Sequence, residues 1–392
     1  MSHNDDGLTI ARERIAEEAR TRTGSLDLRM LGLDELPAEL FGLTFLRRLN
    51  LGGSYWDAEG NQVDRASWIA PNRLDSQLHR LAALPDLCAL SLSGTTLTTL
   101  AGIAHLRTLE SLDCTGTQVS DLSPVGGLSA LQTLNITQTQ VSNLSPLSGL
   151  SALQTLVCSG THVKALSPLS GLSALQTLDC QDTQIRELSP VSGLIALQTF
   201  NCSNTEVSDL SSLSGLSALQ MLNCWETEVS DLSPLIGLSP LQWLNCGGTK
   251  VSDLSPLSVL SALQSLYCWD TEIRDLSPLS GLGALQTLNC SGTQIKDLSP
   301  LSGLSALQTL YCDGTQIKDL SPLSGLTALQ TFHCSRCFLE TIPEDFCLLR
   351  WMPFTCSKPK CRESRSRCCL RVNTITVCIP YALISGISAQ AR

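Results

Sequence analysis

The stretch "LNCSGTQIKDLSPLSGLSALQT", Leu288 to Thr309, is followed directly by "LYCDGTQIKDLSPLSGLTALQT", Leu310 to Thr331. Each copy is 22 residues long, and the two copies differ at only three positions. The differing pairs are Asn289 and Tyr311, Ser291 and Asp313, and Ser305 and Thr327. Close tandem copies of this length indicate a stacked repeat architecture rather than the separate domains that a chain of 392 residues would otherwise suggest.

The same repeat occupies most of the chain. Twelve units run without an insertion, each reading approximately L-x-x-L-x-C-x-x-T-x-[IV]-x-D-L-S-P-L-x-G-L-x-A. Their leading residues are Leu87, Leu109, Leu131, Leu153, Leu175, Leu197, Leu219, Leu241, Leu263, Leu285, Leu307 and Leu329. Two further units in a different style precede them, "SLDLRMLGLDELPAEL" from Ser25 and "LRRLNLGGS" from Leu46. We therefore expect one solenoid over residues 23–346.

Each unit predicts a short strand and a tight return. In "LQTLNCS", Leu288 and Cys290 alternate with polar residues, so one face of the strand is buried and the other is polar. Strands that all run the same way stack into a parallel sheet. In "DLSPLSGL", Ser299 is the expected helix N-cap, Pro300 the first helical residue and Gly303 the end of the turn. Since about one helical turn fits there, short 3₁₀ or irregular turns are expected on the convex side.

The repeat resembles leucine-rich repeats in their short form, as in the internalins and the short-repeat phosphatase regulators. It carries Cys in the third leucine column and Thr where most such repeats carry Asn. The resemblance implies an α/β fold, a horseshoe-shaped solenoid with a parallel concave sheet. The order "EEART…LDL…LPxEL", "YWDAEGN…NRL" and "LDCTGTQVSDLSP" is also similar to the leucine-rich region of bacterial Roco-type proteins. Those proteins carry a GTPase domain after the repeats, but no G-x-x-x-x-G-K-[ST] motif occurs in this sequence.

Two columns of the repeat predict its interior. Leu92 and Ile136 stand in the Cys column of two units, which indicates that burial decides this column, and we expect reduced thiols in a reducing compartment. The Thr column is expected to satisfy backbone groups of the adjacent coil. The cysteines are Cys114, Cys158, Cys180, Cys202, Cys224, Cys246, Cys268, Cys290, Cys312 and Cys334.

Three segments depart from the repeat. Residues 1–22 predict a polar helix or cap, and residues 55–80 form an insertion that is either a binding loop or a cover for the seam between the two repeat styles. Residues 347–392 form a tail without repeat period, basic between Lys358 and Arg371 and rich in Cys. This tail is interpreted as a cap, a disordered segment or the product of an altered reading frame, with a metal site as a weaker alternative.

Composition and motifs exclude several classes of function. A net charge of −10 argues against nucleic-acid binding, and the sequence contains no run of 18 apolar residues and no signal-peptide h-region. No membrane partner is expected, and the predicted location is cytoplasmic, with a secreted effector as the alternative. The few His residues fall in unrelated columns and no G-x-S-x-G motif is present, so we expect no enzyme activity and no cofactor or metal.

The candidate site lies on the outward strand positions of the second half of the chain. Most copies carry Thr, Asn, Asp or Ser there, whereas several units carry large aromatic or acidic residues. The predicted partner-binding residues are Met221, Trp225, Glu226, Trp243, Tyr267, Trp269, Asp270, Tyr311, Asp313 and His333. Gly247 and Gly248 lie between the strands of Trp225 and Trp269, which predicts a slot about 10 Å wide between these two rings.

Exposed Trp and Tyr on a small polar sheet are typical of a protein-binding hot spot. The sequence therefore favours a non-enzymatic module that binds a protein on its concave face. Two alternatives remain from the residues alone: the detached sensor or regulatory region of a Roco-like GTPase or other signalling protein, and a structural array without a dedicated ligand. The sequence makes no prediction of oligomeric state.

Overall fold

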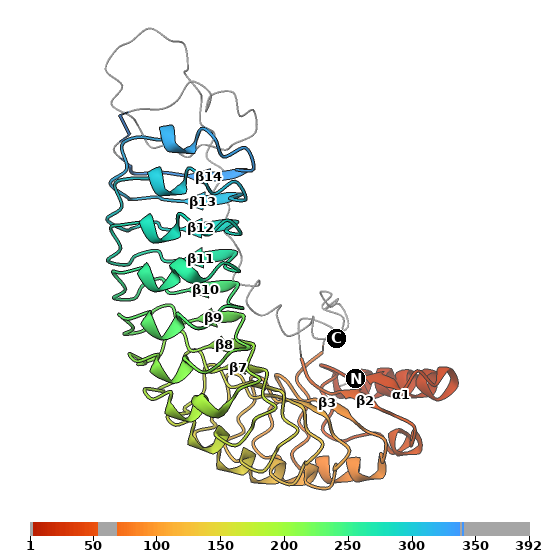
Figure 1. The fold of residues 1–392 in the computed structure, drawn as a ribbon. Coiled ribbons are helices and arrows are strands. Elements are labelled where there is room, and N and C mark those ends of the chain that lie inside the picture. Colours follow the sequence, from red (N-terminus) through yellow and green to blue (C-terminus); the bar gives the residue numbers. More distant parts are fainter. Residues whose placement is uncertain (1–2, 54–68, 338, 341–392) are drawn as a thin grey trace, which may run out of the picture. The chain divides into compact units, whose positions relative to one another are not determined.

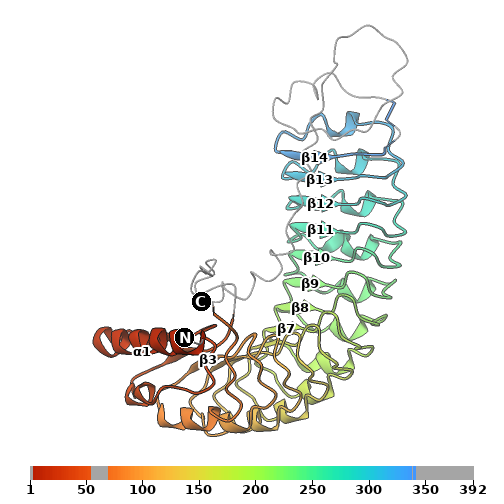
Figure 2. The ribbon, with the colours of Figure 1, turned by 180° about the vertical axis from the view of Figure 1, so that it is seen from behind.

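The computed structural model describes residues 3–53, 69–337, 339 and 340. The chain divides into two compact units, the first holding the described residues up to Gln184 and the second those from Ile185 onward. In each unit, short coils stack in chain order, each with one strand and one short helix (Figures 1 and 2). The tail, residues 347–392, and most of the last repeat-like segment lie outside the described residues.

The first unit contains a parallel sheet whose strands pair in chain order. Its strands are β1 (Ser25–Asp27), β2 (Arg48–Asn50), β3 (Ala89–Ser91), β4 (Ser111–Asp113), β5 (Thr133–Asn135), β6 (Thr155–Val157) and β7 (Thr177–Asp179). Its 3₁₀ helices are η1 (Ala38–Gly42), η2 (Leu78–Ala83), η3 (Ala101–Ile103), η4 (Ser123–Val125), η5 (Ser145–Leu147) and η6 (Ser167–Leu169). Helix α1 (His3–Thr21) packs against β1 and η1. In the ranges that the structure describes, no helix is long and apolar enough to cross a membrane.

The second unit repeats this arrangement. Its strands are β8 (Thr199–Asn201), β9 (Met221–Asn223), β10 (Trp243–Asn245), β11 (Ser265–Tyr267), β12 (Thr287–Asn289), β13 (Thr309–Tyr311) and β14 (Thr331–His333). Its 3₁₀ helices are η7 (Ser189–Gly193), η8 (Ser211–Leu213), η9 (Ser233–Leu235), η10 (Ser255–Val259), η11 (Ser277–Leu279), η12 (Ser299–Leu301) and η13 (Ser321–Leu323). Parallel strands and short 3₁₀ turns confirm the predicted solenoid class.

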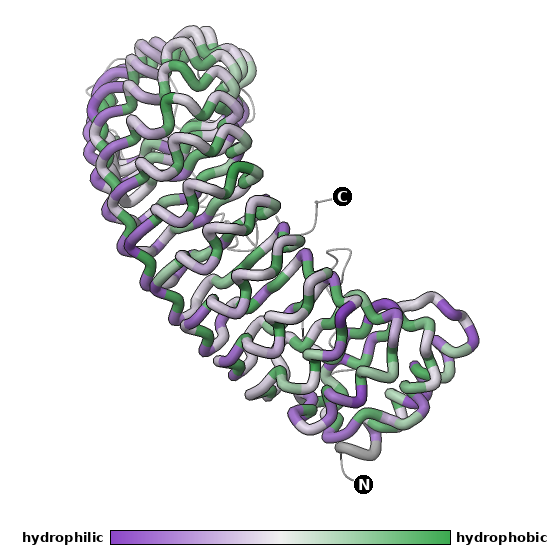
Figure 3. Tube along the Cα trace, turned by 60° about the horizontal axis from the view of Figure 1, so that its bottom comes forward, coloured by the Kyte–Doolittle hydropathy of each residue, from purple (hydrophilic) through white to green (hydrophobic). Residues whose placement is uncertain are grey.

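The core is a stack of aliphatic and cysteine side chains. Apolar and polar residues alternate along each coil (Figure 3), and the central residue of each strand is buried. All ten cysteines of the Cys column are buried, as the sequence predicted, and they are free thiols. Burial raises the pKa of Cys246 and of Cys290 to about 12, so both remain protonated at neutral pH.

The buried thiols give a labelling prediction. Iodoacetamide at pH 7 is expected to leave the buried Cys column unmodified in the native protein and to alkylate the half-buried Cys337, because a hydrogen bond with Cys312 lowers the pKa of Cys337 to about 6. Peptide mapping by mass spectrometry checks this result residue by residue. If Cys246 were alkylated as fast as Cys337, the Cys column would be accessible to solvent, which would contradict its burial.

The Thr column closes each coil on itself. The hydroxyl of Thr293 donates to the backbone carbonyl of Cys290 at 2.6 Å, and the same bond recurs from Thr95 to Thr315 at 2.6–2.8 Å. The acceptor lies three residues earlier in the same coil. The prediction of a bond to the adjacent coil was therefore wrong, because the bend brings the hydroxyl back over its own strand end.

The predicted Ser N-cap is also wrong. Ser299 is the first residue of η12, and the preceding Asp297 supplies the acceptor instead. Its Oδ1 accepts from the Ser299 N–H at 2.8 Å and from the Ser299 hydroxyl at 2.6 Å. An acidic side chain satisfies a free N–H at the start of a helix more strongly than a hydroxyl does, because the bond is charge-assisted.

These carboxylates predict an acid limit to stability. The Ser233 hydroxyl and N–H lower the pKa of Asp231, and matching bonds lower the pKa values of Asp253 and Asp275. A lowered folded-state pKa stabilises the fold above the unfolded-state pKa, about 3.9, and this contribution is lost as pH falls through the folded-state value. We expect the urea midpoint to fall below about pH 4, and to fall less in an Asp231→Asn, Asp253→Asn, Asp275→Asn variant.

The chain contains a natural control for that variant. Asn143 already occupies the Asp position of its coil, and its Oδ1 accepts from the Ser145 N–H at 2.9 Å. The amide therefore keeps the bond without titrating. If the urea midpoint falls equally in wild type and variant below about pH 4, these carboxylates do not set the acid limit.

Candidate functional site

The strand face of the second unit carries the candidate site. Met221, Trp243 and Tyr267 lie within β9, β10 and β11, and Trp225 and Trp269 follow β9 and β11 by two residues. All five side chains are half-buried. The parallel register places Trp243 beside Met221 and Tyr267 beside Asn245. The sequence prediction thus selected residues that the register brings onto neighbouring strands.

Four aromatic side chains pack in two pairs, which we call the aromatic frame. The ring centroids of Trp225 and Trp269 are 6.2 Å apart with an interplanar angle of 40°. Those of Trp243 and Tyr267 are 5.5 Å apart at 45°. Tilted pairs at these separations are favourable for aromatic rings. Burial raises the pKa of Tyr267, with Tyr311 adding to the rise and a hydrogen bond with Trp243 opposing it, so the phenol is neutral at physiological pH.

The predicted 10 Å slot between Trp225 and Trp269 does not exist. A Cβ on Gly247 would lie 2.4 Å from both Cε2 and Nε1 of Trp269, so the indole ring lies directly over this glycine. The prediction left out the ring of Trp269, which fills the space that Gly247 leaves free. The two tryptophans therefore form one continuous aromatic surface.

Gly247 allows a direct test of this ring position. We expect Gly247→Ala to displace the Trp269 indole, weaken the Trp225–Trp269 signal in near-ultraviolet circular dichroism and change the free energy of unfolding by about 1 kcal/mol or less. Ser291→Ala is the matched control, because Ser291 holds the same place two coils later and already bears a Cβ. An unchanged aromatic spectrum in Gly247→Ala would contradict the packing described here.

The predicted acidic residues divide into two kinds. Glu226 and Asp270 are exposed and have φ values of 49° and 50°, in the left-handed region that favours glycine. Glycine occupies the same place at Gly248, Gly292 and Gly314. Asp313 instead joins two coils, since its Oδ1 accepts from the Ser335 N–H at 2.6 Å. Glu226 and Asp270 thus remain as charges beside the aromatic frame, while Asp313 has a structural bond.

Tyr311 and His333 form a separate ring pair. Their centroids are 4.8 Å apart, and they lie on the adjacent strands β13 and β14. They share the strand face with the aromatic frame, but Thr287, Asn289 and Ser291 of the β12 coil lie between them and Tyr267 in register. Seven of the ten predicted residues thus form one main group, and the other three, Tyr311, Asp313 and His333, lie apart from it on the β13 and β14 coils.

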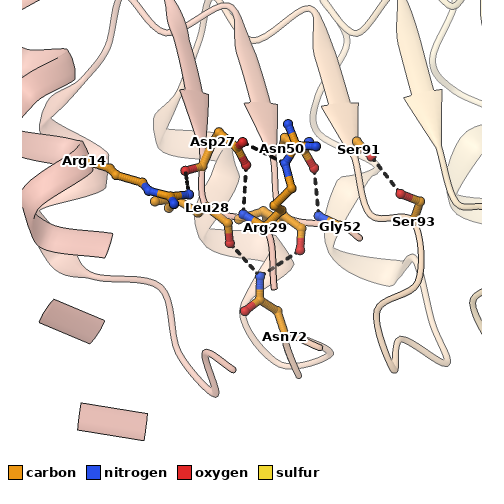
Figure 4. Close-up of polar contacts among 10 residues, drawn as sticks. Arg14, Asp27, Leu28, Arg29, Asn50, Gly52, Asn72, Ser91 and Ser93 are labelled. Carbon is orange, nitrogen blue, oxygen red and sulfur yellow. Dashed lines mark hydrogen bonds and ion pairs between the residues drawn. The ribbon is translucent and has the colours of Figure 1, made fainter. Parts of the chain in front are cut away.

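Sequence reasoning missed the floor of the site. Asn201, Asn223 and Asn245 occupy the central outward column of β8, β9 and β10 and are only 5–9 % exposed. In the first unit, the equivalent Asp27 and Asn50 accept from the N–H two residues later (Figure 4). In the sequence these asparagines resemble other polar strand residues. The large residues on both sides of them were the feature that could have predicted their burial.

No cluster of three His, Cys, Asp or Glu side chains that could hold a metal ion occurs among residues 3–53, 69–337, 339 and 340. The Cys-rich tail, for which a metal site was a weaker alternative, lies outside the described residues. Exposed large aliphatic side chains also occur on the helix side of the second unit, at Ile195, Ile236 and Val259.

Comparison with known proteins identifies the repeat. The model for "Leucine Rich repeats (2 copies)" matches residues 151–193, 261–303, 283–325 and 305–346. No curated protein matches the sequence. The fold is similar to that of an internalin, InlF, from Listeria monocytogenes, with 26 % identity, a TM-score of 0.67, and coverage of 71 % of this chain and 82 % of the other.

Two further solved structures share the fold alone. A leucine-rich-repeat protein of Leptospira interrogans has 21 % identity, a TM-score of 0.75, and coverage of 86 % of this chain and 85 % of the other. The plant peptide hormone receptor RGFR1 in complex with RGF2 has 19 % identity, a TM-score of 0.67, and coverage of 85 % and 55 %. The resemblance to Roco-type proteins is not supported by these matches. The chain carries leucine-rich repeats, folded as a solenoid with internalin-like structural neighbours.

Proposed function

We propose that the strand face of the second unit binds a protein partner, with the aromatic frame at the centre of the contact and without catalysis by this chain. The observation that supports this function is the pairing of four large, half-exposed rings on a face whose other positions are mostly small and polar. Trp and Tyr dominate binding energy at protein interfaces, and they do so where they cluster.

The aromatic frame is suited to this role because its rings already contact one another. Side chains held by packing lose less rotamer freedom when a partner binds. Glu226 and Asp270 add exposed negative charge next to Trp225 and Trp269. The partner surface should therefore be basic or mixed, with an association rate that falls as salt is added.

The structural neighbours support the general role of the repeats. One is an internalin, and another is a peptide hormone receptor solved in complex with RGF2. From these we carry over only the coarse role, a repeat scaffold that interacts with another polypeptide. The position of the site and the character of the partner rest on the residues of this chain.

Affinity capture with a matched control tests the proposed function. The concave variant combines Trp225→Ala, Trp243→Ala and Trp269→Ala, and the convex variant combines Ile195→Ser, Ile236→Ser and Val259→Gly, which restores common repeat residues. Proteins recovered by wild type should be lost with the concave variant and retained with the convex variant. Recovery of the same proteins by both variants would place the binding surface elsewhere.

A further inference from the structure

Asn223 departs from the hydrogen-bonding pattern of its column. In Asn201, Asn245 and Asn289, Oδ1 accepts from the backbone N–H two residues later, at 3.1–3.2 Å. The Oδ1 of Asn223 has no hydrogen-bond partner, although the residue is only 5 % exposed. It is the one buried side-chain polar atom without a partner among the described residues. Its amide nitrogen lies 3.5 Å from the Ser203 hydroxyl, a long contact.

The unpaired acceptor lies beside the aromatic frame. Along its own chain, Asn223 is flanked on the same face by Met221 and Trp225, and Asn245 is its partner on β10. Trp243 lies beside Met221 in register, and Trp269 covers Gly247, two residues after Asn245. Met221 and Trp243 thus lie along one side of the asparagine row, Trp225 and Trp269 lie along the other, and Tyr267 ends the row on β11. Met221, next to Asn223 on this face, has an unbranched and adaptable side chain.

The ring faces and carboxylates around Asn223 favour a positively charged donor. Ring faces of Trp attract cations, and Glu226 and Asp270 carry negative charge. In the strands β8 to β13 and the three residues after each, the charged residues are Glu226, Asp270 and Asp313, with no Lys or Arg among them. A buried carbonyl without a donor is costly, and a donor from a partner removes that cost.

We propose, building on the proposed function, that the partner inserts a Lys or Arg side chain beside the aromatic frame and donates a hydrogen bond to Asn223 Oδ1. Both side chains are donors without an acceptor, so they match a site where Asn223 Oδ1 lacks a donor and where Glu226 and Asp270 carry negative charge. Neutral amide side chains lack the charge that the rings and carboxylates favour. A carboxylate side chain is repelled.

The test uses N-acetyl-arginine amide and N-acetyl-lysine amide as probes of the full chain, with N-acetyl-glutamine amide as the neutral control. Indole N–H resonances, assigned from single Trp→Phe variants, report binding at Trp225 and Trp269. We expect the basic probes to shift these two resonances at concentrations about 10-fold lower than the neutral probe requires. Equal shifts from basic and neutral probes would overturn the proposal.

Two variants of Asn223 separate recognition from folding. Asn223→Leu removes the acceptor at similar side-chain volume and should weaken binding of the basic probes about 10-fold. Asn223→Asp keeps the side-chain shape, adds a negative charge and should strengthen binding of the basic probes. A purely structural role for Asn223 predicts weakening in both, which would also overturn the proposal. If the concave variant loses its captured proteins while both Asn223 variants bind basic probes like wild type, this inference fails and the proposed function stands.

Discussion

Asn72→Ala is expected to lower the free energy of unfolding by roughly 3–5 kcal/mol. Asn72 is fully buried in the first unit, and its Oδ1 accepts from the Leu33 N–H at 2.8 Å. Its Nδ2 donates to the carbonyls of Leu28, at 2.9 Å (Figure 4), and Leu51, at 2.7 Å. Truncation leaves one donor and two acceptors unpaired in an apolar interior, and such groups cost about 1–3 kcal/mol each.

The loss should be local, because each coil of a solenoid contacts only its neighbours. Hydrogen exchange is expected to accelerate in β1, β2 and β3 and to stay near wild type in β10 to β13. Asn143→Ala is the matched control, since Asn143 is exposed and accepts one bond at 2.9 Å. A free energy of unfolding for Asn72→Ala within 1 kcal/mol of wild type would show that Asn72 does not join these segments.

Trp269→Ala is expected to weaken binding of the captured partner by about 30-fold or more, the loss typical of an interface hot spot. Trp269 contacts Trp225 and lies over Gly247, so its removal opens the centre of the aromatic frame rather than its edge. Biolayer interferometry on immobilised partner measures the effect. The weaker binding should come mainly from a faster dissociation rate.

The control for Trp269 is Ile236→Ser on the helix side of the same unit, which removes an exposed side chain of 52 % accessibility. This change should leave the affinity within about twofold of wild type. Both proteins should unfold at similar urea concentrations, since neither residue is fully buried. Wild-type affinity in Trp269→Ala would exclude the aromatic frame as the hot spot.

Much of the fold could be predicted because the same pattern of buried and turn residues occurs in twelve consecutive units. The Leu and Cys columns predicted the buried face, and the short Ser-Pro segment predicted the 3₁₀ turns. The N-cap was wrong because Ser and Asp both occur at the turn, and only the geometry shows that Asp297 accepts both bonds from Ser299. The Thr bond was assigned to the wrong coil for the same reason, since spacing alone does not show which carbonyl a bend approaches.

The candidate site was predictable as a list of residues but not as a surface. Strand register follows from the repeat, so Trp225, Trp243 and Trp269 could be placed on one face. The position of the Trp269 ring over Gly247 depends on side-chain torsions, which the repeat does not specify. The missing bond at Asn223 was equally invisible, because the same residue type makes that bond at Asn201 and Asn245.

Site-specific photocrosslinking tests the central claim most directly. Benzoylphenylalanine is placed either at Tyr267 on the strand face or at Ile236 on the helix side, and each protein is irradiated with the captured partner. The account predicts a covalent adduct with the partner from position 267 and none from position 236. An adduct from position 236 alone would contradict a binding surface centred on the aromatic frame.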